Sequence, residues 1–136
     1  MNELTTKWDG VFDVELTGLS APQQARWLIR EQLAGAVSVP FLRDVLLATS
    51  EVVTNAIRFA PGPIHVTLSR DSLSNAIRVG VADTNPDLPH QSEVDDTPNS
   101  NGRGLLIVDT VASSWGTQPT ATGKEVWFEM VPEQRT

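Results

Sequence analysis

The sequence of 136 residues contains no cysteine and only two histidines, His65 and His90, which stand far apart. The absence of cysteine excludes a disulfide framework and any metal site built on thiolates. The two separated histidines form no metal-ligand motif. A structural role is the better prediction for both of them.

Basic residues are also scarce, because 10 Lys and Arg stand against 17 Asp and Glu, a net charge of -7. This balance argues against nucleic acid or an anionic membrane as the main partner, since both require a basic patch. No apolar run approaches the roughly 20 residues of a membrane span. The first ten residues, MNELTTKWDG, lack the basic and apolar regions of a signal peptide. We therefore expect a cytoplasmic protein.

The apolar residues that are present follow a pattern of alternating strands and helices. Hydrophobic residues make up 40% of the chain, a usual value for a globular domain that buries a core. The periodicity predicts the order β-α-α-β-β-loop-α-β-β, an α/β (α+β) two-layer sandwich with a mainly antiparallel mixed sheet and helices on one face. The expected strands are 11–17, 64–71, 76–83, 115–118 and 124–131, and the expected helices are 19–35, 41–59 and 104–115.

The start of the first expected helix carries a recognisable capping pattern. Ser20 suits the N-cap position, and Gln23 three residues later completes a capping box. Gly35 can end the same helix. Between the second pair of strands and the last helix lies a polar loop of about twenty residues without periodicity. Such a loop in a compact domain is usually a lid, a binding loop or disordered.

A stripe of polar residues runs along the end of the second expected helix. Glu51, Asn55 and Arg58 share one face at 3.6 residues per turn, beside apolar rows that suit a core. For this helix alone, a solvated face with an ion pair is the simpler interpretation. The alternative is a nucleotide site, because an amide oxygen suits Mg²⁺ and a carboxylate one turn away can accept a proton from an attacking hydroxyl.

Two further motifs have the same double interpretation. Asp83 ends an expected strand, where an Asp often only forms a turn, but a carboxylate also suits the exocyclic amine of adenine. Gly102 and Gly104 lead into an apolar helix within NSNGRGLLIVD. Such glycines let backbone N–H groups approach phosphates at a helix N-terminus. They also serve simple close packing, so this motif is weak when taken alone.

Together and in order, the motifs are E-x-x-x-N on a helix, D-x-N-P at a strand end, a polar loop, and G-x-G-L opening a helix. This combination resembles the GHKL ATPase superfamily, which has the Bergerat fold, over about residues 10–131. The stretches EVVTNAIRFA, GRGLLIVDTVASSWG and GKEVWFEM resemble the small histidine-kinase-like ATPase domains of the anti-sigma-factor serine-kinase type. The resemblance implies one domain over 1–136, with a core at about 10–131 and a lid at about 84–103.

The resemblance also implies roles for the residues that match the motifs. Glu51 would be the general base, Asn55 the Mg²⁺ ligand and Asp83 the residue that binds adenine. The remaining nucleotide-binding positions lie near the phosphates or beside the base, and Arg103 among them would reach the γ-phosphate. These positions are Arg58, Asn85, Gly102, Arg103, Gly104 and Leu105.

Some positions depart from the family pattern. Asn85 stands where many members of the superfamily have Gly, so its backbone is expected to be less permissive. Phe59 stands where close relatives often have His. Lys124 and Glu125 follow Gly123 where the wider superfamily often has Thr. This last departure weighs against a water-mediated contact to adenine at that strand.

The function implied by the resemblance is that of an ATP-binding regulator. It would be an Mg-ATP-dependent serine/threonine protein kinase acting on an anti-sigma factor antagonist of the STAS type. A sigma factor and a second copy of the chain are further candidate partners, whereas direct contact with nucleic acid or a membrane is not expected. One alternative is a nucleotide-dependent protein-binding module with little or no kinase turnover. Another is an α/β scaffold that binds no nucleotide.

Overall fold

The structure, a computed structural model, describes residues 8–59, 62–85 and 102–132. The elements within these ranges follow the order predicted from the sequence. They are β1 (Trp8–Leu16), α1 (Ala21–Leu33), α2 (Val39–Phe59), β2 (Ile64–Asp71), β3 (Ile77–Asp83), α3 (Gly102–Val111), β4 (Ser114–Pro119) and β5 (Lys124–Met130). No helix in this part of the chain is long and apolar enough to cross a membrane. The predicted lid at about 84–103 lies almost entirely outside the described residues.

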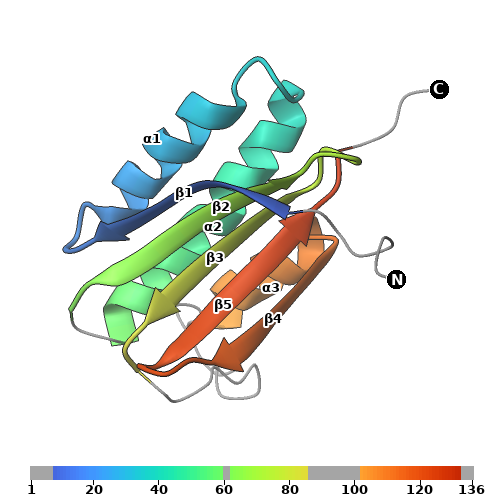
Figure 1. Ribbon diagram of the computed structural model, residues 1–136. Coiled ribbons are helices and arrows are strands. Elements are labelled where there is room, and N and C mark those ends of the chain that lie inside the picture. Colours follow the sequence, from blue (N-terminus) through green and yellow to red (C-terminus); the bar gives the residue numbers. More distant parts are fainter. Residues whose placement is uncertain (1–7, 60–61, 86–101, 133–136) are drawn as a thin grey trace, which may run out of the picture.

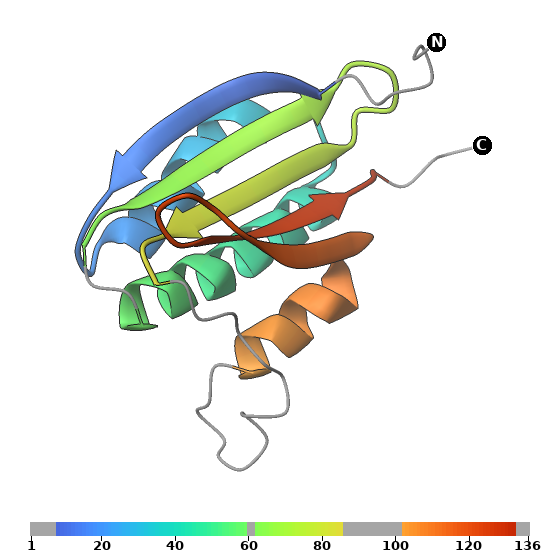
Figure 2. The ribbon, with the colours of Figure 1, turned by 60° about the horizontal axis from the view of Figure 1, so that its bottom comes forward.

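The strands form one open sheet in the order β1-β2-β3-β5-β4. All four strand pairings are antiparallel. The helices lie together on one face of this sheet, and none of the described residues forms a helix on the other face (Figures 1 and 2). The predicted two-layer α+β sandwich is therefore confirmed, and its sheet is antiparallel at every pairing.

The core lies between the sheet and the helices, and it follows from alternation along the strands. In β2, β3 and β5, the residues that face the helices alternate with residues on the open face, and all of the inward residues except Arg70, Asp83 and Lys124 are buried and apolar. Each such aliphatic side chain contributes about 1.5–3 kcal/mol when it is fully buried. The largest of these inward side chains are Ile64, Val66, Leu68, Ile77, Val79, Val81 and Phe128.

The ends of α1 confirm one sequence prediction and correct another. Gly35 follows the helix with φ +86°, a conformation that favours glycine. The predicted capping box is wrong, because Ser20 has helical angles and its side chain caps no backbone N–H. Its Oγ instead accepts a hydrogen bond from Gln24 Nε2 at 2.7 Å. An N-cap residue needs extended backbone angles to direct its side chain at the first turn.

The helix α3 also differs from its predicted bounds. It begins at Gly102 rather than 104 and ends at Val111 rather than 115. Ser114 and Trp115 belong to β4, where Trp115 pairs with Phe128 of β5. The Trp115 indole N–H donates to Asp109 of α3 at 2.9 Å, which ties the new strand back to the helix that precedes it. Sheet pairing therefore outcompetes the last predicted helical turn.

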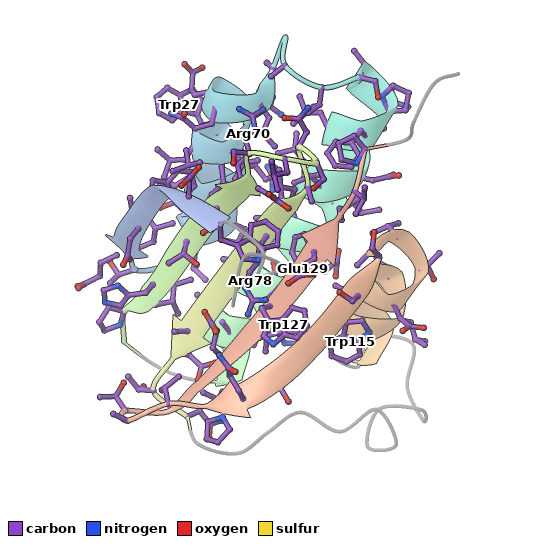
Figure 3. The ribbon with its side chains drawn as sticks, turned by 45° about the vertical axis from the view of Figure 1, so that its right-hand side comes forward. Trp27, Arg70, Arg78, Trp115, Trp127 and Glu129 are labelled. Carbon is purple, nitrogen blue, oxygen red and sulfur yellow. The ribbon has the colours of Figure 1, made fainter. Side chains whose placement is uncertain are left out.

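The open face of the sheet carries a polar and aromatic cluster instead of a second layer. Arg78 of β3 lies over the ring of Trp127 of β5, 4.3 Å from its centroid. The same guanidinium donates to Glu129 at 2.6 Å (Figure 3). The Arg78 and Glu129 side chains are 28% and 26% exposed. The cluster covers part of the open face while leaving it accessible to water.

Candidate functional site

The elements that carry the predicted site residues meet at one end of the molecule. At that end α2 and β3 finish and α3 starts (Figures 1 and 2). The first residue of β5, Lys124, pairs there with the last residue of β3, Asp83. The helix α2 packs against both α3 and β3. The fold thus brings together elements whose motifs are separated by up to 54 residues in the sequence, from Glu51 to Leu105.

The polar stripe of α2 lies at the border of the core. Val52, Val53 and Ala56 are buried against the sheet, whereas Glu51 and Asn55 between them are half-buried. Arg58, in the last turn of the helix, is exposed. Glu51 and Asn55 therefore lie one turn apart on a half-buried surface that is neither core nor fully solvated.

Asp83 is buried in an ion pair that sequence analysis did not predict. Lys124 Nζ lies 3.1 Å from Oδ1 and 2.9 Å from Oδ2 of the Asp83 carboxylate. The side chain of Lys124 is 8% exposed and that of Asp83 is 2% exposed. Both stand on the helix-covered face of the sheet, because they continue the inward rows of β5 and β3. A charged pair takes the place of the next core pair in these rows.

The backbone of Asn85 completes the surroundings of this ion pair. Its N–H donates to Asp83 Oδ1 at 2.8 Å, and its carbonyl accepts from Lys124 Nζ at 3.2 Å. The three N–H donors of the ammonium thus have three acceptors. Among the described non-glycine residues, a positive φ occurs only at Asn75. Asn85 therefore needs none of the conformational freedom of the glycine that it replaces in the family pattern.

The carboxylate of Asp83 retains hydrogen-bond acceptor capacity despite this pairing. A carboxylate offers about four lone-pair positions, two on each oxygen. Within the described residues, Oδ1 accepts from the Asn85 N–H and from Lys124, while Oδ2 accepts from Lys124 alone. An acceptor position on Oδ2 therefore remains for a donor such as an amine.

Gly123 fixes the relative position of the strands that carry the pair. A Cβ at this residue would lie 2.6 Å from Thr84 Cα and closer still to the carbonyl oxygen of Asp83. The obstacles are backbone atoms, which cannot turn aside as a flexible side chain can. Glycine is therefore required here so that the start of β5 can approach the end of β3.

The start of α3 differs from the sequence prediction in one respect. Gly102, Arg103, Gly104 and Leu105 form its first turn, so the two glycines lie inside the helix rather than before it. The side chains of Arg103 and Leu105 lie outside what the structure describes. The first backbone N–H groups of a helix have no partner within it, which suits an anion. The predicted phosphate-binding role of this turn stays a prediction.

The donors at this end of the molecule fit magnesium bound together with a nucleotide. Mg²⁺ prefers oxygen ligands and retains waters and substrate phosphates, so it needs few protein ligands. Asn55 and Glu51 provide an amide oxygen and a carboxylate on one helix face. Among the described residues, no group of three or more His, Cys, Asp or Glu could hold a metal by itself.

Lys124 is the residue whose role the sequence analysis missed. It was noted only as a departure from the family pattern. Alternation in KEVWFEM places Lys124 on the same face as Val126, Phe128 and Met130, which are buried. A lysine in a buried row requires an acidic partner, because an unpaired buried charge is costly. That argument would have led to Asp83 once the pairing of β3 with β5 was known.

A family model described as the histidine kinase-like ATPase domain matches residues 20–130 of this chain. The matched segment contains every residue of the candidate site. A comparison with curated proteins found no match.

Solved structures share the fold at low sequence identity. The structure of the RsbU and RsbW domains of Rv1364c from Mycobacterium tuberculosis is similar with a TM-score of 0.66 and 18% identity, over 91% of this chain and 34% of that one. The Erythrobacter litoralis EL346 blue-light activated histidine kinase is similar with a TM-score of 0.53 and 22% identity, over 79% of this chain and 39% of that one. The structure of its histidine kinase domain is similar with a TM-score of 0.51 and 21% identity, over 80% of this chain and 58% of that one. This chain therefore spans between about a third and three fifths of those chains.

Proposed function

Because the chain belongs to the histidine kinase-like ATPase domain family, we propose that it binds Mg-ATP and phosphorylates a protein on serine or threonine. The substrate class is an anti-sigma factor antagonist of the STAS type, with a sigma factor as a second partner and the cytoplasm as the place of action. The substrate assignment rests on the resemblance of EVVTNAIRFA, GRGLLIVDTVASSWG and GKEVWFEM to anti-sigma-factor serine kinases.

One observation carries the nucleotide part of this proposal. The last part of α2, which carries Glu51 and Asn55, meets the end of β3 at Asp83 and the glycine-containing first turn of α3 at the same end of the molecule. Each motif has a bland interpretation when it is taken alone. Their convergence supports a single ligand with a base, phosphates and a metal, which a solvated helix face and a turn-forming Asp would not require.

The residues of this site would divide the work between binding and proton transfer. Asp83 would accept from the base, and Asn55 would hold the metal. Arg58, Arg103 and the backbone of the first α3 turn would attract the phosphates. Bound Mg²⁺ supplies neutralisation of phosphate charge. The Glu51 carboxylate would take the proton of the attacking serine or threonine hydroxyl, so that the oxygen becomes the nucleophile.

The test is a nucleotide titration with and without Mg²⁺, followed by transfer of labelled γ-phosphate to a candidate antagonist protein. Magnesium-dependent ATP binding together with labelling of serine or threonine supports the whole proposal. Binding without transfer to any antagonist protein supports the alternative, a nucleotide-dependent binding module. Absence of ATP binding at millimolar concentration contradicts both and leaves an α/β scaffold without nucleotide.

A further inference from the structure

We propose that Lys124 is a specificity-determining residue of the base site, which donates a hydrogen bond to the ring nitrogen next to the amine of adenine. This inference rests on the proposed function, since it assigns a second contact within the same ATP site. Asp83 and Lys124 would then act together as an acceptor and a donor side by side. The matching ligand edge presents a donor and an acceptor side by side, as the N6 amine and N1 of adenine do.

The position of Lys124 is set by the sheet. Lys124 and Asp83 are direct cross-strand partners at the end of the β3 and β5 pairing. Gly123 allows the two backbones to approach closely at the same point. Nζ consequently lies 2.9 Å from Oδ2, the oxygen that retains an acceptor position. An adenine amine that donates to Oδ2 therefore comes close to the ammonium of Lys124. The ring nitrogen next to that amine then faces Nζ.

The hydrogen-bond inventory allows both contacts to form. Lys124 uses its three donors on Oδ1, Oδ2 and the carbonyl of Asn85, and the contact to that carbonyl is the longest at 3.2 Å. A small displacement of the Lys124 side chain can turn this N–H from the Asn85 carbonyl to a ring nitrogen while both contacts to the carboxylate persist. The Asn85 carbonyl is the acceptor that loses least, because a neutral acceptor binds an ammonium less strongly than a carboxylate does.

A purely structural explanation accounts poorly for a lysine at this position. Burying an ion pair gains little net stability, because desolvation of the two charges offsets their attraction. Apolar residues at both Asp83 and Lys124 would complete the two inward rows without this desolvation cost. The other strong ion pair between β3 and β5, Arg78 with Glu129, lies on the open face, where about a quarter of each side chain stays exposed. The buried pair stands where the ligand is expected.

The first experiment removes the hydrogen bond between Lys124 and the adenine ring, once by changing the nucleotide and once by changing the protein. Dissociation constants are measured for ATP and for 1-deaza-ATP, in which a C–H replaces N1, with wild type and with Lys124→Met. Wild type is expected to bind 1-deaza-ATP about 10- to 100-fold more weakly, the usual effect of a hydrogen bond to a charged group. Lys124→Met should bind the two nucleotides equally, because the donor is gone.

A second experiment leaves the protein unaltered and therefore does not depend on folding of the variant. The sequence contains two lysines, Lys7 and Lys124. Protein labelled with ¹⁵N-lysine should thus give two Nζ resonances. Saturating ATP should shift the Lys124 resonance, whereas 1-deaza-ATP should shift it much less. Lys7 serves as the internal control.

The results separate this inference from the function on which it rests. If wild type binds neither nucleotide, the proposed function and the inference are both wrong. If wild type binds ATP and 1-deaza-ATP equally, or if Lys124→Met keeps the wild-type preference, the ATP site stands and Lys124 has no contact to the ring. Tighter ATP binding by Lys124→Met with an unchanged preference would show that the lysine competes for Asp83, which also contradicts the inference.

Discussion

Glu51 and Asn55 stand one turn apart on α2, yet the proposed chemistry gives them separable effects. Glu51→Gln keeps the shape of the side chain and removes the base, so Mg-ATP affinity should stay near wild type. Phosphate transfer should fall by about 10²- to 10⁴-fold, the usual contribution of a general base. Asn55→Ala should lose both Mg-ATP affinity and phosphate transfer, because the residue that holds the metal supports binding as well as chemistry. Nucleotide titration beside transfer of labelled phosphate measures the two effects.

If the Glu51→Gln variant transferred phosphate at the wild-type rate, the assignment of Glu51 as the general base would be wrong. Ser50→Ala is a suitable control on the same helix. The Ser50 side chain is directed toward α1, where it accepts a hydrogen bond from Arg26. The ATP affinity and transfer rate of this variant should both resemble wild type.

The ion pair of Asp83 and Lys124 also leads to a prediction about the free energy of unfolding of single-residue variants. Lys124→Met leaves a carboxylate that is 2% exposed without its counter-charge. Breaking a buried pair in this way costs about 3–5 kcal/mol. Glu129→Gln, at the partly exposed pair with Arg78, should cost about 1 kcal/mol or less. Urea unfolding of both variants gives the comparison, and equal losses would mean that burial of the Asp83 pair has no special cost.

A double substitution tests whether that cost comes from the unpaired charge. Asp83→Leu combined with Lys124→Met replaces both charges by apolar groups, which is often neutral or stabilising at a buried pair. The double variant should therefore be more stable than Lys124→Met alone. A double variant that is less stable than the single one would point to lost packing rather than to an orphaned charge.

At the scale of elements, the approach of β5 to β3 depends on Gly123. Gly123→Ala would place a methyl group against the backbone of Asp83 and Thr84, with 2.6 Å to Thr84 Cα. Overpacking of this kind costs about 1–3 kcal/mol. Because the displaced strand carries Asp83, ATP affinity should fall as well. Gly10→Ala in β1 is the matched control, since its Cβ would meet no atom within 4 Å.

Thermal or urea unfolding and nucleotide titration of these two variants measure the effect. The Gly123 variant should lose both stability and affinity, and the Gly10 variant should lose neither. A Gly123→Ala protein with wild-type ATP affinity would show that the β3 and β5 junction does not position the base site.

The elements themselves were largely predictable from sequence, because each depends on a short periodic pattern. Strict alternation in 64–71 and 124–131 gave strands within one residue of those observed. Element ends were less predictable. Ser114, expected only in the helix, joins β4 because the sheet offers it a partner in Glu129, a tertiary contact that no local pattern contains. Ser20 fits a capping box by residue type, but the backbone enters the helix with angles that prevent it.

The sequence nominates the residues of the candidate site, which stay a prediction, but it does not contain the arrangement of charges around Asp83. Asp83 was identified from its position at a strand end and from the family resemblance. Its partner Lys124 is 41 residues away in the sequence and becomes a neighbour only when β5 pairs beside β3. Strand order in an antiparallel sheet is a global property, because β4 and β5 could equally have paired beside β1. The ion pair therefore required the structure.

At the scale of the whole molecule, a ligand that binds only the folded state must stabilise it. The increment is RT ln(1 + [L]/Kd), about 2.7 kcal/mol when free ligand is a hundredfold above Kd. For a domain of this size, that increment corresponds to a rise of roughly 10 °C in Tm. Mg-ATP should produce such a shift in a thermal melt, and GTP should produce a smaller one if Asp83 recognises the amine of adenine.

The size of the shift should follow the nucleotide and the metal, which distinguishes site binding from a general effect of polyanions. ATP with EDTA in place of Mg²⁺ should stabilise less than Mg-ATP, and Asn55→Ala should reduce the difference between the two, because that residue would hold the metal. Inorganic triphosphate at equal concentration lacks the base and should give a small shift. If millimolar Mg-ATP leaves the Tm unchanged while the protein melts cooperatively, the end of the molecule that carries Glu51, Asn55 and Asp83 is not an ATP site.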